Sequence, residues 1–123
     1  MAQAKLDKFG PVALTTTLTT NILNPADAGA GHVGYTPTAS QIILKHMRVV
    51  NKTAGAVSVS LWVGATGGNA AGTEFLWSGK SVPANDSIEW FGNFVLNTAD
   101  FLVGGASANT SLTIEGEMEV TLV

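Results

Sequence analysis

The stretch Leu112-Thr-Ile-Glu-Gly-Glu-Met-Glu-Val-Thr-Leu122 decides the fold class, because apolar and polar residues alternate along almost all of it. Successive side chains of a β-strand point to opposite faces, so this stretch has one apolar and one polar face. We therefore expect a long strand whose apolar side lies on a hydrophobic core. Its polar side carries Glu115, Glu117 and Glu119.

The same alternation recurs in residues 57–63, where Val57, Val59 and Leu61 share one face. The upstream segment 41–51 is rich in β-branched residues, and Asn51-Lys-Thr-Ala-Gly55 joins the two segments with the composition of a hairpin turn. The alternation in 41–51 is less regular, because Lys45 falls on the side of the apolar residues. We expect two antiparallel strands here.

Weaker strand patterns complete the chain, and no window shows apolar residues at helical spacing between a cap and a stop. Together they predict about seven or eight strands with turn signals about every 8–12 residues, which is typical of an antiparallel β-sandwich or a jelly-roll-like barrel. The weaker candidates are residues 12–23, 74–77, 87–91, 94–96 and 101–103.

The chain length of 123 residues predicts a single β-sandwich domain over 1–123. Residues 1–40 are expected to form an extended N-terminal segment that includes a long loop over 24–40. A loop of this length in a compact domain is usually functional or disordered. We expect it to reach over a neighbouring subunit, the alternative being a flexible surface loop.

Charged residues make up only 12% of the sequence, about half the usual share, whereas apolar residues make up 46%. The surface is therefore poor in charge, which indicates that part of it is buried against a partner. A neutral surface rich in Thr and Ser is the alternative.

The charge pattern excludes several partners. The net charge is −3 and the six basic residues form no cluster, so nucleic-acid binding is not expected. No apolar run is long enough for a membrane span. The absence of cysteine excludes disulfides, and Met1-Ala-Gln-Ala-Lys5 lacks the apolar core of a secretion signal.

No motif points to catalysis, a cofactor or a metal. Residues 29–34 match the dinucleotide pattern G-x-G-x-x-G, but that motif works only between a strand and a helix, and no helix is predicted. His32 and His46 are the only histidines, too few for a typical zinc site in a chain without cysteine. The glutamates of 112–122 are expected to be solvated, to blunt an edge strand or to meet a basic partner. We therefore expect a protein that is not an enzyme.

The aromatic residues indicate an interface. Trp62 falls on the face opposite the apolar side of its strand, and the adjacent Trp90 and Phe91 must point to opposite faces of theirs. Outward aromatic residues often anchor interfaces. Our predicted interface comprises Trp62, Trp90 and Phe91 with His32 and Tyr35 of the 24–40 loop. The alternative is that both sheet faces are covered within the domain.

Three segments resemble small β-sandwich proteins of tailed-bacteriophage virions: His46-Met-Arg-Val-Val-Asn-Lys-Thr53, Val57-Ser-Val-Ser-Leu-Trp-Val-Gly64 and Gly79-Lys-Ser-Val-Pro-Ala-Asn-Asp-Ser-Ile-Glu-Trp90. In those proteins a strand ending in V-V-N turns into a V-x-L-W-V-G strand, and a V-x-A-N turn leads to another strand. The resemblance covers about residues 40–96 and concerns strands and turns only. It implies a virion component without enzymatic activity.

Within that resemblance, our leading interpretation is a capsid decoration (cement) protein. Such proteins often sit as homotrimers on the capsid surface, bound to the major capsid protein, after synthesis in the host cytoplasm. A minor tail or baseplate protein is the second interpretation. The third is a carbohydrate-binding β-sandwich module, with Trp62, Trp77 or Trp90 as the stacking platform.

Overall fold

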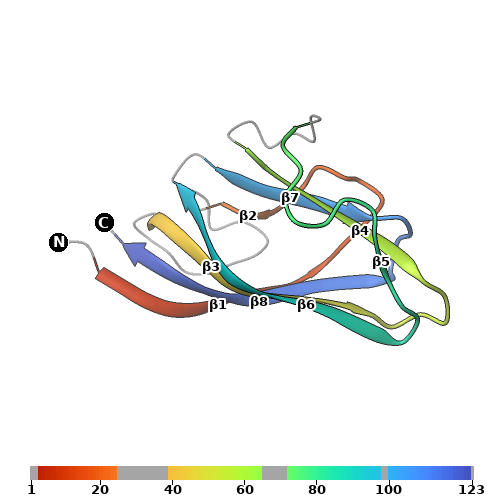
Figure 1. The fold of residues 1–123 in the computed structure, drawn as a ribbon. Coiled ribbons are helices and arrows are strands. Elements are labelled where there is room, and N and C mark those ends of the chain that lie inside the picture. Colours follow the sequence, from red (N-terminus) through yellow and green to blue (C-terminus); the bar gives the residue numbers. More distant parts are fainter. Residues whose placement is uncertain (1–2, 25–38, 65–71, 98–99, 123) are drawn as a thin grey trace.

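The computed structural model describes residues 3–24, 39–64, 72–97 and 100–122. It is all-β, with eight strands in two antiparallel four-stranded sheets packed as a sandwich, which confirms the expected fold class (Figure 1). No helix long and apolar enough to cross a membrane occurs in the described part of the chain.

The two sheets form the two layers seen in Figure 1. Sheet A has the strand order β1-β8-β3-β6, and sheet B has the order β2-β7-β4-β5. The bounds in sheet A are β1 Gln3–Ala13, β8 Leu112–Leu122, β3 Ala39–Asn51 and β6 Asp86–Asn97. Those in sheet B are β2 Thr20–Leu23, β7 Phe101–Ala106, β4 Val57–Gly64 and β5 Lys80–Val82.

The strands pair in a nested order. β1 pairs with β8, β2 with β7, β3 with β6 and β4 with β5, and all of these pairs are antiparallel. The chain therefore resembles one long hairpin that is folded over into two sheets, and the pairs β3·β8 and β4·β7 join its halves. This is the arrangement of a jelly roll, which was one of the two expected architectures.

The core lies between the inner faces of the two sheets. β8 shows why: Leu112, Ile114, Met118 and Val120 are all buried, as its alternation predicts. Because β8 lies between β1 and β3, its glutamates do not protect a sheet edge, and that part of our interpretation was wrong.

A β-bulge in β3 explains the irregular position of Lys45. Leu44 and Met47 are both fully buried, and the register against β6 and β8 shifts between Leu44 and His46. The extra residue of a bulge lets two consecutive side chains lie on one face. Lys45 and His46 therefore both lie on the outer face of sheet A.

The structure differs from the predicted strands at the N-terminal end. β1 was not predicted, because a register shift between Phe9 and Val12 breaks its alternation. Gly10 lies within this shift with a φ of 78°, in the left-handed region that favours glycine. Residues 25–38 of the expected long loop lie outside the described part of the chain.

Three further differences concern residues 74–97. Residues 74–77 form no strand and contribute a single bridge between Glu74 and Trp62. β5 was not predicted, because its three residues are too few to show a period. β6 is one strand and not the two expected, because β3 pairs with it along its full length.

A hydrogen-bonded corner joins the β3–β4 turn to the β5–β6 turn. The Nδ2 atom of buried Asn51 donates to the carbonyl oxygens of Gly55 (2.9 Å) and Val82 (3.0 Å). Its Oδ1 accepts from the N–H and the hydroxyl of Thr53. The N–H of Asn85 donates to the carbonyl of Thr53 at 3.0 Å, so the two turns bind each other directly.

Candidate interface on the outer face of sheet A

The cross-strand register places the outward residues of sheet A in rows. In each row, the residues come from strands in the order β1, β8, β3 and β6. One row consists of Leu6, Glu119, Ile43 and Val95, and the next of Lys8, Glu117, His46 and Phe91. In the row beyond, Arg48 lies between Glu115 and Glu89. This face therefore carries both apolar and charged side chains.

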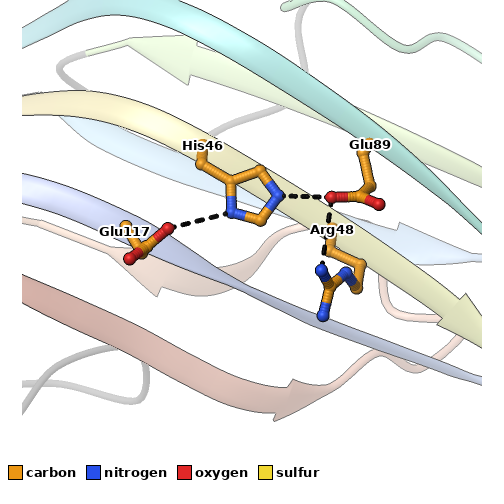
Figure 2. A network of polar contacts seen from close by, with 4 residues as sticks. All are labelled: His46, Arg48, Glu89 and Glu117. Carbon is orange, nitrogen blue, oxygen red and sulfur yellow. Dashed lines mark hydrogen bonds and ion pairs between the residues drawn. The ribbon is translucent and has the colours of Figure 1, made fainter.

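His46 is the centre of a polar network on this face, and Figure 2 shows it between two glutamates from the neighbouring strands. Its Nε2 lies 2.8 Å from Oε2 of Glu89 in β6. Because a carboxylate only accepts hydrogen bonds, Nε2 is the donor. Its Nδ1 lies 3.4 Å from Oε1 of Glu117 in β8, which is an ion-pair distance without hydrogen-bond geometry. The imidazole therefore links three strands.

Glu89 also accepts a hydrogen bond from Arg48, whose Nη2 lies 3.3 Å from Oε2. The pKa of Glu89 is lowered from its ordinary value of 4.5, mainly because of the hydrogen bond from His46. The hydrogen bond and charge of Arg48 act in the same direction, whereas partial desolvation acts against them. This environment favours the ionised carboxylate.

The aromatic ring of Phe91 stacks on His46, with ring centroids 4.5 Å apart and an interplanar angle of 16°. The stack and the two glutamates leave only 12% of the His46 side chain exposed. Phe91 itself is 71% exposed, and Val95, four residues further along β6, is 43% exposed. The network therefore holds an aromatic ring toward solvent at one side of the sheet.

A groove of about 260 Å³ lies over β1, β8 and β3, and His46, Arg48 and Glu117 of the network line one part of it. Its lining carries charges of both signs, from Lys8, Arg48, Glu115 and Glu117. Such mixed charge fits a protein partner better than a single small anion or cation. No group of three or more metal-ligating side chains occurs among the residues that the structure describes.

The predicted interface residues differ in their exposure and in the sheet face on which they lie. Trp62 is 8% exposed, although its side chain lies on the outer face of sheet B, opposite the core residues of β4. Trp90 is half-buried and packs against the core, whereas its neighbour Phe91 points outward. His32 and Tyr35 lie outside the described residues. Of the three predicted residues that the structure describes, only Phe91 belongs to the outer face of sheet A.

Sequence reasoning missed the role of His46. The sequence indicates a packed or surface residue of a strand and not a metal ligand, and the partners Glu89 and Glu117 lie far away in the sequence. The available indication in the sequence was Lys45, which breaks the apolar alternation of residues 41–51. A bulge at that position turns His46 outward. The positions opposite His46 then follow only from the register of three strands.

Comparison with known proteins assigns no family to the chain. No model of a known protein family matches the chain, and no curated protein matches it.

Proposed function

We propose that the chain is a structural virion protein of a tailed bacteriophage. In this proposal it is a capsid decoration protein that binds the major capsid protein and further copies of itself, and it performs no reaction. The trimeric state that the resemblance implies belongs to the same proposal.

The outward aromatic ring of Phe91 carries this proposal. A 71%-exposed phenylalanine and a 43%-exposed valine on the same face of β6 supply apolar area that a partner can cover. Aromatic residues at the centre of an interface supply most of its binding free energy. The charged residues around Phe91 then supply orientation and the rate of association.

Two features of the fold support the same proposal. The segments on which the resemblance rests form one unit, because the turn after β3 and the turn before β6 bind each other at the corner around Asn51. Jelly rolls recur in viral capsid proteins, although they also occur in lectins and cupins. The fold by itself does not assign a function, so it only adds to the observation on Phe91.

The carbohydrate-binding alternative gains no support from the tryptophans. A stacking platform needs an exposed ring face, and Trp62 and Trp77 are each only 8% exposed. Trp90 is half-buried, and its ring contacts Phe75 with the centroids 6.0 Å apart. The candidate surface is therefore better suited to a protein than to a sugar.

Co-sedimentation with empty shells assembled from the major capsid protein tests the proposal. We expect saturable binding of the purified chain to these shells. The glutamates on the outer face of sheet A predict that binding weakens with added salt. Binding no greater than that of an unrelated β-sandwich would contradict the proposal, as would finding the chain only in the tail.

A matched pair of charge reversals locates the contact. Glu117→Lys changes an exposed residue on the outer face of sheet A, and we expect it to weaken shell binding by about tenfold. Glu74→Lys makes the same change in charge at an exposed residue beside β4, and we expect no effect. Equal losses in both variants would show that overall charge, and not this face, controls binding.

A further inference from the structure

β6 forms an open edge of sheet A. In the order β1-β8-β3-β6, no other described strand pairs with its far side. It spans 12 residues, whereas strands of about 5–6 residues are typical. Long edges are usually protected by lysine or proline, and β6 contains neither. An unprotected edge of this length is a template for pairing with another chain.

The geometry of His46 shows which main-chain groups of β6 face this edge. A β-carbon built on Gly116 of β8 meets the carbonyl oxygen of His46, so this carbonyl points toward β8 and away from β6. Phe91 lies opposite His46 in β6. The pair is therefore not hydrogen-bonded, and the N–H and C=O of Phe91 point to the free edge.

The ends of the strand agree with this assignment. The N–H of Ser87 donates to Oδ1 of Asp86 at 2.7 Å, and that of Asn97 donates to Oδ2 of Asp100 at 2.9 Å. Both donors are an even number of residues from Phe91. The register against β3 shifts between Phe91 and Phe94, but burial alternates without a break from Ile88 to Asn97, so both donors lie on the same side of the strand. Local carboxylates thus occupy the outward N–H groups at the two ends. Between them, the outward main-chain groups belong to Glu89, Phe91, Asn93 and Val95.

We infer that this edge binds β6 of a second copy of the chain in antiparallel orientation, with Gly92 on the two-fold axis. In this register, Phe91 lies opposite Asn93 of the second copy, and Glu89 lies opposite Val95. Every outward main-chain group between the two carboxylate-capped ends then has a partner. The result is one continuous sheet of two subunits.

The charge distribution along β6 favours a second copy of the chain as the partner and an antiparallel orientation of the two strands. Asp86 and Glu89 are its only charged residues, and both lie in its first half. Antiparallel pairing places the acidic half of each copy opposite the neutral half of the other. Parallel pairing would bring the glutamates of the two copies together, which is destabilising.

The side chains on both faces fit the same register. On the outer face, the two Phe91 rings become diagonal neighbours, a distance that aromatic side chains can span. On the inner face, Trp90 lies opposite Phe94 of the second copy, and an aromatic pair of this kind stabilises a non-hydrogen-bonded position. The pairing thus gives each exposed apolar residue of β6 a neighbour at the edge and leaves the outer face of the sheet open.

This inference does not rest on the virion assignment, although the proposed function also includes contacts between copies and uses Phe91. A two-fold axis through an edge pair is perpendicular to the sheet, so the outer faces of both copies point the same way. The dimer would therefore present the outer faces of two copies of sheet A, side by side, to a capsid or to any other partner. It forms in solution without the capsid, so it can fail while the virion assignment holds, and the reverse is also true.

Sedimentation velocity and native mass spectrometry of the full chain, from about 1 μM to about 1 mM, test the inference. We expect a concentration-dependent dimer. Phe91→Lys should raise its dissociation constant by about tenfold or more, because it removes apolar contact and adds charge at the edge. Leu18→Lys adds the same charge at an exposed leucine outside both sheets and should leave the dimer unchanged. Circular dichroism checks that both variants are folded.

Asn93→Pro separates strand pairing from a merely apolar contact. It removes one outward N–H of β6 and spares the hydrogen bonds to β3, whereas Asn93→Ala removes only the side chain that binds Lys45. We expect the proline variant to weaken the dimer about tenfold and the alanine variant to leave it nearly unchanged. A monomer up to about 1 mM, trimers without dimers, or a dimer that survives both Phe91→Lys and Asn93→Pro would overturn the inference.

Discussion

The ring of Phe9 in β1 lies over Gly116 in β8, so close that a β-carbon on the glycine would be 2.7 Å from Cε1 of the ring. The same β-carbon would also collide with the carbonyl oxygen of His46 in β3. Gly116 therefore lets β8 lie against an aromatic ring and the neighbouring main chain at once. It is the one small residue on the apolar side of the stretch that decides the fold class.

Gly116→Ala should lower the free energy of unfolding by about 2–4 kcal/mol, because one obstacle is main chain and cannot rotate away. Gly64→Ala in β4 is the control, since nothing lies within 4 Å of a β-carbon at that position. We expect the control to change stability by less than about 0.5 kcal/mol. Urea denaturation followed by tryptophan fluorescence measures both, and equal effects would contradict the packing described.

Asn51→Leu should also destabilise the fold by about 2–4 kcal/mol, because it leaves the carbonyl of Val82 without its buried donor and the N–H of Thr53 without its acceptor. Asn51→Asp separates the hydrogen bonds that Asn51 donates from those that it accepts. Its carboxylate still accepts from Thr53 but no longer donates, so most of the loss should remain. Exposed Asn97→Ala is the control, with an expected change below about 1 kcal/mol in the same denaturation experiment. A stable Asn51→Asp variant would show that the hydrogen bonds donated by Asn51 contribute little to the free energy of unfolding.

The pKa of Glu89 should lie below 4.5 in carboxyl-detected NMR titrations of the folded protein. A lowered pKa in the folded state means that Glu89 stabilises the fold above pH 4.5 and loses this contribution as the pH falls through the lowered value. His46→Ala should return the pKa toward 4.5 more than Arg48→Ala does, because the hydrogen bond from His46 is the largest cause. The opposite order would contradict the geometry of the network.

The stack of Phe91 on His46 should give a measurable coupling in a double-mutant cycle. With His46→Ala, Phe91→Ala and the double variant, we expect a coupling free energy of about 0.5–1.5 kcal/mol, as for other stacked rings. The Phe91→Ala variant should remain folded because Phe91 is mostly exposed, and circular dichroism checks the His46→Ala variant. Strict additivity of the two single effects would mean that the stack does not hold Phe91 in place.

The fold was predictable where the side-chain period is unbroken. Strands β4 and β8 alternate regularly, and both occur where the sequence predicts them. β1 was not predictable, because its bulge between Phe9 and Val12 shifts the alternation by an amount that no local pattern reveals. β5 was missed because its three residues show no period.

The candidate interface was predictable only in part. The adjacency of Trp90 and Phe91 indicates that one ring points outward, but which ring does so depends on the register with β3. The burial of Trp62 was not visible, because it depends on packing outside the alternation of its own strand. His46 meets Glu89 and Glu117 only after three strands that are distant in the sequence are aligned.

Cryo-electron microscopy of purified virions that carry this gene is the most direct test of the virion assignment. We expect density for the two-sheet sandwich on the capsid shell, in contact with the major capsid protein and with neighbouring copies of itself. Particles in which this density is absent from the shell, while the chain is made in the infected cell, would contradict the assignment.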